Sequence, residues 1–277
     1  MSGSATVLGL TVALYLIGAV LLGANLLLRR PGLLAAGRSA ALVGVFLHAA
    51  AIGLRCVELH RAPFTSPAES LSLLAWIVAL IYLAMEMLWR LSASGPFALG
   101  LSFLLVLLGA ALHGDSGHRA GVAARQGALL SHNAISLHII ATISAIAAFA
   151  LAFCCAALYL TAHRILKSKH GLAWMKRLPP LVTVESAAFT LVAVGFPLLT
   201  LGILSGLIRA VNGGLAPGWQ TDPKTLLAYA VWCVYGTYLW ARLAANWPPT
   251  RTAYILLIGL VLSLLLFFIP SAAHHFV

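Results

Sequence analysis

The segment from Trp219 to Lys224 carries the densest set of chemically capable side chains in this sequence. It places an indole, the Asp222 carboxylate and an ammonium close together, between two long apolar runs. Only 8% of the 277 residues are charged, and a polar group near hydrocarbon is costly unless an interaction offsets the cost. The pattern predicts a polar loop at a membrane surface that can hold a flat, amphipathic ligand.

The histidines suggest what that ligand is, because neutral imidazole is a good ligand for haem iron or a divalent metal. Ten histidines are a high count for so apolar a chain. His138 opens one apolar run and His274 closes the last, so we predict them as two axial ligands flanking Trp219, with His275 as the alternative to His274. The other histidines near predicted outer helix ends are His60 and His132. Interfacial histidines also occur only because their polar tips favour the headgroup region, and this structural interpretation stays open.

Haem propionates need cationic partners at the same surface. Arg125, Arg209 and Lys224 are predicted to supply them, since guanidinium and ammonium groups form charge-assisted hydrogen bonds with carboxylates.

The remaining polar residues favour structural roles. Ser66-Pro67-Ala68-Glu69 fits a capping box, and Asp222 followed by a proline fits a helix N-cap. Glu86 is expected to pair with Arg90 four residues later, and Glu185 to lie in the first turn of its helix. His48, inside an apolar run, is either a functional group or a hydrogen-bond partner of a neighbouring helix.

Several function classes find no support. The chain has no Ser/His/Asp order, GxSxG, HExxH or phosphate-binding glycine loop, so we expect no enzyme of the hydrolytic or nucleotide-using kind. Its four cysteines form no CxxC pair and are expected to be packing residues. The net charge of +11 comes from short loops rather than from a basic arm with interleaved aromatics, which argues against a nucleic-acid partner.

The composition indicates that this protein is embedded in a lipid bilayer. With 62% hydrophobic residues and a mean hydropathy of +1.01, the chain is far more apolar than a soluble domain. Its apolar runs are continuous rather than alternating, which predicts an all-α, polytopic membrane protein. Residues 1–277 are expected to form a single transmembrane domain without short repeats. The eight predicted membrane-spanning helices are 4–28, 40–57, 68–88, 97–113, 138–162, 185–209, 225–243 and 252–272.

The distribution of Lys and Arg predicts the orientation. Eight spans leave both termini on one side of the membrane. The loops on the opposite side hold 11 of the 17 basic residues, namely Arg29, Arg30, Arg38, Arg90, Arg164, Lys167, Lys169, Lys176, Arg177, Arg242 and Arg251. The other 6 are Arg55, Arg61, Arg119, Arg125, Arg209 and Lys224. Since cytoplasmic loops are the more basic, both termini and the Trp219 loop are expected outside, in the periplasm.

Several stretches of the chain resemble one family in the same order. They are Ser70–Trp76, Leu137-His138, Gly195–Gly206, Asp222-Pro223-Lys224 and His274. Together, from about the second span onward, they resemble the cytochrome c assembly proteins of the CcsA/CcmC type. The resemblance implies a polytopic haem-handling protein whose external tryptophan-rich loop is flanked by two histidine ligands. It assigns those two positions to His138 and His274.

The chain departs from the family pattern in two places. Its loop keeps one tryptophan, Trp219, where well-known members carry several, and Trp240 stands where a histidine is expected deeper in the seventh span. The stretch 222–227 and the compact length are more similar to the HemX/YpjD-like branch.

We therefore expect a non-enzymatic, haem-handling protein of cytochrome c biogenesis in a bacterial inner membrane. It would hold haem b at the outer face and deliver it, in company with other cytochrome c maturation membrane proteins. One alternative is a membrane scaffold or regulator that keeps the fold without haem, which the single loop tryptophan favours. A second is a small-solute transporter, because Gly195-Phe196-Pro197 is expected to break the sixth span.

Overall fold

The computed structural model describes residues 3–60, 66–111, 133–168, 179–209, 211 and 218–269, and these residues are mainly helical. The long helices are α1 (Gly3–Leu28), α2 (Pro31–Leu59), α3 (Pro67–Trp89), α4 (Gly95–Ala111), α6 (Asn133–Ser168), α8 (Leu181–Arg209), α9 (Pro223–Leu243) and α10 (Pro249–Leu265). Two single-turn 3-10 helices, η1 (Ser92–Ser94) and η4 (Trp219–Thr221), precede α4 and α9. The all-α prediction is confirmed for this part of the chain.

Six stretches of helix are long and apolar enough to cross a membrane. They are Gly3–Leu28, Pro31–Leu59, Pro67–Trp89, Ser92–Ala111, Leu137–Ser168 and Leu181–Ile208, and they coincide with the first six predicted spans. The seventh predicted span is helical as α9, and the eighth is the shorter apolar helix α10, of 17 residues. The protein is therefore a polytopic membrane protein.

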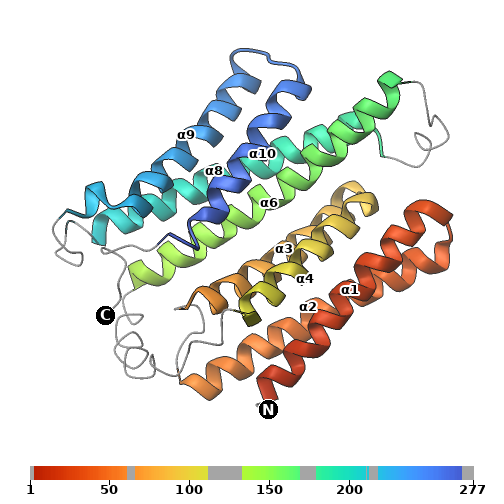
Figure 1. Ribbon diagram of the computed structural model, residues 1–277, viewed down its shortest axis with the longest axis horizontal. Coiled ribbons are helices and arrows are strands. Elements are labelled where there is room, and N and C mark those ends of the chain that lie inside the picture. Colours follow the sequence, from red (N-terminus) through yellow and green to blue (C-terminus); the bar gives the residue numbers. More distant parts are fainter. Residues whose placement is uncertain are drawn as a thin grey trace.

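The long helices form two groups of four (Figure 1). In the first group α1, α2, α3 and α4 pack in a closed ring, each on the next, with α4 returning to α1. In the second group α6, α8, α9 and α10 pack in a ring of the same kind. The two rings meet mainly where α3 lies against α6. Each ring buries a continuous apolar interior and exposes large hydrophobic side chains outward, as expected for helices in lipid.

Helix α6 is the most deeply buried helix of the second ring, and small side chains let its neighbours approach closely. Between Ala145 and Ala152 every residue is buried. Phe149 within this stretch stacks on Tyr235 of α9, with ring centroids 3.5 Å apart. A Cβ on Gly195 of α8 would lie 2.7 Å from the Phe149 ring, so glycine is required where α8 crosses it.

Buried polar bonds hold the first ring together. The His48 ring on α2 lies between the Tyr15 hydroxyl of α1 and the Ser72 hydroxyl of α3, at 3.1 and 3.0 Å. The Trp76 indole of α3 donates to the Val45 carbonyl of α2. Of the two roles left open for His48, the structure shows the hydrogen bond to neighbouring helices.

Both predicted helix caps are confirmed. The Ser66 hydroxyl accepts from the Glu69 backbone N–H while the Glu69 carboxylate accepts from the Ser66 N–H, which completes a capping box at the start of α3. At the start of α9, the Asp222 carboxylate accepts from the Lys224 backbone N–H. Each cap satisfies backbone donors that the first helical turn leaves unpaired.

Two predictions for acidic residues are wrong. Glu86 forms its ion pair with Arg38 of α2 rather than with Arg90. Arg90 is the C-cap of α3 in the left-handed conformation (φ 53°), so its side chain does not continue the helical i,i+4 direction. Helix α8 begins four residues before Glu185, which therefore lies beyond the first turn and pairs with Arg242 of α9.

The predicted break in the sixth span is also wrong. Helix α8 runs without interruption from Leu181 to Arg209, with Pro197 inside it. The Thr200 hydroxyl donates to the Phe196 carbonyl within the turn that contains the proline, and the Trp232 indole of α9 donates to the same Thr200 oxygen. The neighbouring helix thus supports the segment that the proline weakens.

Several helix bounds differ from prediction, and α6 (Asn133–Ser168) extends beyond its predicted span at both ends. Helix α2 begins at Pro31 rather than at residue 40, because a proline at the first helical position is well tolerated and Arg38 can lie inside a helix near the headgroups. Helix α10 ends at Leu265 and continues as turns through residue 269, short of the predicted end at residue 272.

The structure reveals a long-range correspondence between α3 and α9, the third helices of their rings. Each begins with an N-cap side chain followed by proline, Ser66-Pro67 in one and Asp222-Pro223 in the other. Nine residues after each proline stands a tryptophan, and fifteen residues after it stands a buried tyrosine. Nineteen residues after each proline stands a charged residue that forms an ion pair with the second helix of the ring. The corresponding pairs are Trp76 and Trp232, Tyr82 and Tyr238, and Glu86 and Arg242. In both rings the tryptophan and the ion pair tie the third helix to the second.

Candidate functional site at one end of the helix bundle

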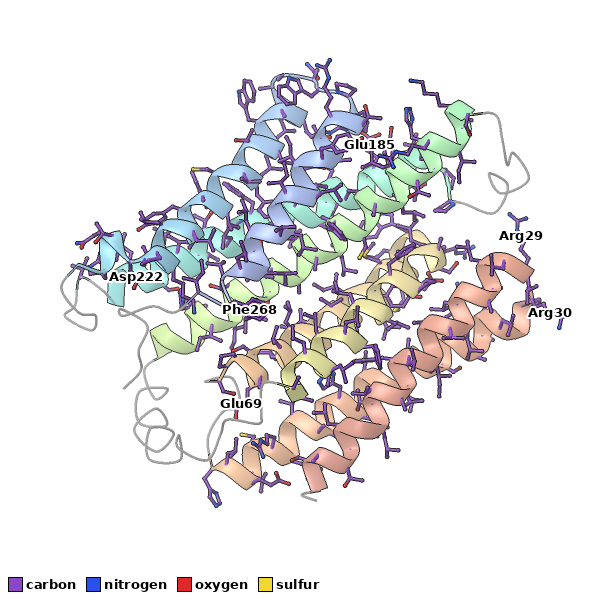
Figure 2. The ribbon with its side chains drawn as sticks, viewed as in Figure 1. Arg29, Arg30, Glu69, Glu185, Asp222 and Phe268 are labelled. Carbon is purple, nitrogen blue, oxygen red and sulfur yellow. The ribbon has the colours of Figure 1, made fainter. Side chains whose placement is uncertain are left out.

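His138 lies in the second turn of α6. The N-terminal end of α6 lies at the end of the bundle where Figure 2 labels Glu69 and Asp222. The Nδ1 atom of His138 is 2.6 Å from the Gly202 carbonyl oxygen of α8. Because a carbonyl oxygen only accepts, Nδ1 must carry the proton of this hydrogen bond, and in the neutral ring Nε2 then carries the lone pair. The ring is half-buried, so one side packs on α8 and part of it remains accessible.

Two glycines of α8 create the space for this contact. A Cβ at Gly206 would lie 3.1 Å from His138 Nδ1 and 3.2 Å from its Cε1. A Cβ at Gly202 would lie 2.4 Å from the Thr142 hydroxyl oxygen, one turn further along α6. The buried Ser205 hydroxyl donates to the Gly202 carbonyl at 2.8 Å, so that oxygen accepts from both helices.

The Trp219 segment forms η4 and leads directly into α9. Gly218 precedes it with φ 87°, a conformation that glycine adopts without strain. Both the backbone N–H and the hydroxyl of Thr221 donate to the Gly218 carbonyl, at 3.1 and 3.0 Å. Trp219 is half-buried, while Asp222 is buried and caps α9. The predicted polar loop is therefore a tight turn with its indole partly accessible.

Lys224 supplies a cation at this end. Its side chain is half-buried one residue before the apolar run that begins at residue 225. Burial lowers the pKa of the Lys224 ammonium, and the nearby Asp222 carboxylate partly offsets that shift. An ammonium with reduced hydration binds an incoming carboxylate more strongly than one in open water does.

The structure brings several predicted site residues to one end and leaves others untested. The α6 helix that carries His138 packs along α8, while Trp219, Asp222 and Lys224 form the junction that starts α9. His60, the left-handed C-cap of α2, is exposed. Arg125, His274 and His275 lie outside the described residues, as do the His132 and Arg209 side chains.

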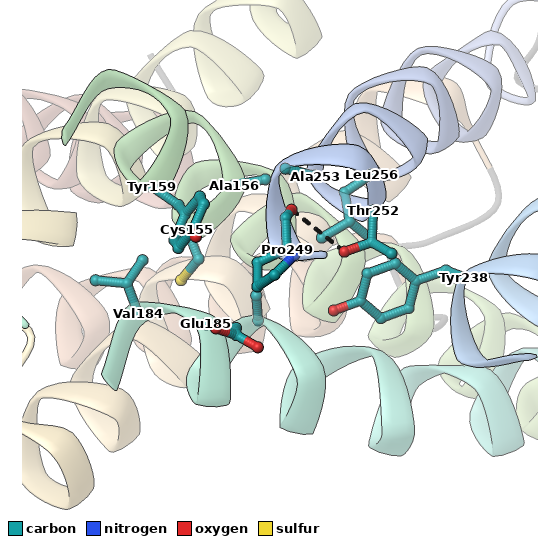
Figure 3. Close-up of a pocket in the computed structure, with 11 residues that line it drawn as sticks. Cys155, Ala156, Tyr159, Val184, Glu185, Tyr238, Pro249, Thr252, Ala253 and Leu256 are labelled. Atoms are coloured by element: carbon teal, nitrogen blue, oxygen red, sulfur yellow. Dashed lines mark hydrogen bonds between the residues drawn. The ribbon is translucent and has the colours of Figure 1, made fainter. Parts of the chain in front are cut away.

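A second polar cluster lies at the opposite end of the second ring, where Figure 2 places Glu185. It lines a small cavity whose polar groups come from Cys155, Tyr159, Glu185, Tyr238 and Thr252 (Figure 3). The space open to the centre of a water molecule is about 20 Å³, which suits one ordered water rather than a planar cofactor. Sequence reasoning missed this cluster, because Glu185 and its partner Arg242 lie 57 residues apart and no local pattern links them.

Two further observations bear on metal binding. Among the residues with described positions, no three His, Cys, Asp or Glu side chains gather to hold a metal ion. The four cysteines are free thiols, with Cys154 and Cys155 buried and Cys56 and Cys233 exposed. The packing role predicted for the cysteines thus fits the buried pair.

Comparison with known proteins identifies relatives over most of the chain. The sequence is 26% identical to the cytochrome c biogenesis protein CcsA of Gloeothece citriformis, an alignment that covers 92% of this chain and 88% of that protein. It is 29% identical to protein HemX of Bacillus subtilis over 66% of this chain and 64% of HemX.

A shorter stretch is more similar. It is 38% identical to CcsA of Thermosynechococcus vestitus over 85 residues, which make up 31% of this chain and 26% of that protein. The chain thus matches only about a quarter of the length of that relative. The model of the cytochrome c assembly protein family matches residues 66–274, which include every described residue of the site around His138 and Trp219. This chain belongs to the cytochrome c assembly protein family.

Proposed function

We propose that this protein binds haem b at the outer face of a bacterial inner membrane and delivers it for cytochrome c biogenesis. The protein would act as a carrier and not as an enzyme: it binds, orients and passes on a cofactor whose chemistry is its own. Membership of the cytochrome c assembly protein family supports the biogenesis role.

The single observation that carries the proposal is the hydrogen bond between His138 Nδ1 and the Gly202 carbonyl. Histidines that bind metals commonly donate their other ring N–H to a carbonyl or carboxylate, which fixes the tautomer and orients the ring. The residues therefore fit a haem iron through His138 Nε2. Trp219 would supply an aromatic surface and Lys224 a cation for a propionate, with Asp222 holding the turn between them.

Residues outside the described ranges complete the proposed site. His274 would be a second residue to hold the iron, with His275 as its alternative, and Arg125 would be a second partner for a propionate.

The position of His138 along α6 supports an interfacial site. His138 and Arg164 are separated by 26 residues, or about 39 Å of helix at 1.5 Å per residue. A bilayer is about 40–45 Å thick with its headgroups and about 30 Å without them. If Arg164 lies among the inner headgroups, His138 lies at the outer boundary of the hydrocarbon.

We further propose that all eight long helices cross the membrane as one domain, with the His138 end outside. Basic side chains support this orientation, since Arg29, Arg30 and Arg242 lie at or near the end opposite Asp222. Helix α9 has 21 residues, about 31 Å, which is enough to cross the hydrocarbon core.

Absorbance spectroscopy of the purified protein tests the function. We expect a Soret band in the purified protein or after titration with haemin. His138→Ala should weaken haem binding at least tenfold, and His274→Ala should do the same. His163→Ala is the matched control, because His163 stacks on Tyr159 near the opposite end of α6 and should leave the band unchanged.

The same experiment separates the alternatives. A protein that stays colourless and binds no added haemin would overturn the proposal and support the scaffold or regulator, which the single loop tryptophan favours. Equal loss in the His138 and His163 variants would show a general effect on folding instead of ligation. The transporter loses its specific argument, because α8 continues through Pro197.

A further inference from the structure

The contact between α6 and α8 at His138 provides two things: a hydrogen-bond acceptor for the ring, which is the Gly202 carbonyl, and room for the ring over Gly206. We propose that the Gly202 carbonyl, supported by Ser205, and the gap at Gly206 are positioning groups that present His138 Nε2 to the haem iron. This inference rests on the proposed function, and it concerns groups on α8 rather than the ligand itself.

The first argument is the acceptor. At 2.6 Å the bond from His138 Nδ1 to the Gly202 oxygen is short for an N–H donor and a carbonyl. The Ser205 hydroxyl donates to the same oxygen at 2.8 Å, and Ser205 itself is buried. The carbonyl is thus held on a rigid helix by a neighbouring side chain, and it admits only the Nδ1–H tautomer of the histidine.

The second argument is the space. The His138 ring lies over Gly206, where even a methyl group would come within 3.1–3.2 Å of two ring atoms. Contacts that short are tighter than nine in ten Cβ contacts, so alanine at residue 206 requires the His138 ring to shift by a few tenths of an ångström relative to its acceptor. Residue 202 must also be glycine, because a Cβ added there would clash with the Thr142 hydroxyl oxygen of α6.

The Thr142 oxygen offers a way to separate these two effects. It is buried and has no hydrogen-bond partner among the residues whose positions are described, so its removal leaves none of their polar atoms unpaired. In Thr142→Ala the nearest remaining atoms to a Cβ at residue 202 are backbone atoms of Thr142 at 3.4 and 3.5 Å, ordinary van der Waals distances. The double variant T142A/G202A should therefore restore the helix packing that G202A disturbs.

The first readout needs no haem. Solid-state ¹⁵N NMR of histidine-labelled, haem-free protein in liposomes, with His138 assigned by comparison with His138→Ala, should show a protonated Nδ1 and an unprotonated Nε2. G206A should lose that signature, and T142A/G202A should keep it. Gly100→Ala is the control, because a Cβ there meets no atom within 4 Å.

The second readout is haemin titration of the same variants. Groups that orient a metal ligand typically contribute 10- to 100-fold in affinity, so G206A should bind haemin about 10- to 100-fold more weakly. G202A should bind more weakly than T142A/G202A, and Gly100→Ala should match the wild type. Ser205→Ala should lower the midpoint potential of the bound haem, because the Gly202 carbonyl then accepts more strongly from His138 and makes it a stronger donor to iron.

The outcomes distinguish this inference from the proposed function. If His138 shows the protonated Nδ1 but no variant binds haemin, haem binding fails and the orienting contact stands. If the protein binds haemin while G206A binds equally well, or while His138 carries its proton on Nε2, the positioning inference is overturned and haem binding stands. An unchanged midpoint potential in Ser205→Ala would remove Ser205 from the positioning group.

Discussion

At the scale of single residues, the sequence was sufficient to predict the helix caps that involve Asp222 and Glu69, because a cap at a helix start has a local signature. It also selected His138 as a ligand, and that role stays a prediction. It could not supply the Gly202 acceptor of His138, since that contact depends on how α6 packs on a helix 64 residues away. The same limit explains why Glu86 was paired with Arg90 in sequence, whereas its true partner is the distant Arg38.

Gly218 gives a prediction at this scale. Its φ of 87° is strained for any other residue, while a Cβ there would meet no atom of the described residues within 4 Å. Gly218→Ala should therefore destabilise the η4 turn by about 1–2 kcal/mol through backbone strain alone. Thermal unfolding in detergent and the wavelength of Trp219 emission would measure this loss of stability. Gly53→Ala is the control, because a Cβ at this position on α2 meets no described atom within 4 Å. If Gly218→Ala is as stable as the wild type, the predicted backbone strain at residue 218 is wrong.

At the scale of helices, apolar runs and punctuation by proline and charge predicted each long helix. Bounds were less accurate, because the hydropathy of a run does not show where capping and headgroup contacts extend a helix. Pro197 is the clearest example: the local sequence suggests a break, and the Thr200 and Trp232 hydrogen bonds that support the helix come partly from α9.

The two N-caps provide a matched prediction. Ser66→Ala and Asp222→Ala each remove a side-chain acceptor at a helix start, and each should cost about 0.5–2 kcal/mol in the free energy of unfolding. Asp222→Ala should also weaken haemin binding, because it loosens the turn that holds Trp219, whereas Ser66→Ala should not. Guanidinium unfolding and haemin titration would check both. Equal effects on haemin binding would contradict the assignment of the turn at Asp222 to the site.

The Arg38–Glu86 pair tests how α2 and α3 are joined. Arg38→Met leaves the Glu86 carboxylate, which is 6% exposed, without its cation. We expect a loss of about 2–3 kcal/mol, below the ~3–5 kcal/mol of a fully buried pair, because the Arg38 side chain is 43% exposed to solvent. Glu86→Gln should cost less, since it leaves no buried charge. Unfolding in detergent would measure both, and a larger loss in Glu86→Gln would contradict this account.

At the scale of the whole molecule, hydropathy predicted a helical membrane protein, but not the two closed rings; the orientation predicted from charge stays a prediction. The correspondence between α3 and α9 escaped sequence reading because only a few positions match across 156 residues. Among the matching positions, the tryptophan and the ion pair tie the third helix to the second, so ring closure explains why these two residue types recur.

Labelling of single cysteines tests the orientation. Cys56 is exposed near the end of α2, on the side proposed to face outward. In a variant that keeps only Cys56, a membrane-impermeant maleimide should react with intact spheroplasts. In a cysteine-free background, Arg30→Cys at the opposite end should react only after permeabilisation. The reverse pattern would invert the proposed topology.

The length of α6 has a consequence for the lipid environment. At 36 residues this helix is about 54 Å long, well beyond the thickness of the hydrocarbon, and the charges of Arg164 and Lys167 anchor one end. With that end anchored, the depth of the opposite end depends on bilayer thickness, so longer acyl chains would submerge the imidazole of His138, and shorter chains would leave it in water. Nanodiscs with graded acyl-chain length should therefore tune haemin uptake, which makes bilayer thickness a control on cofactor access.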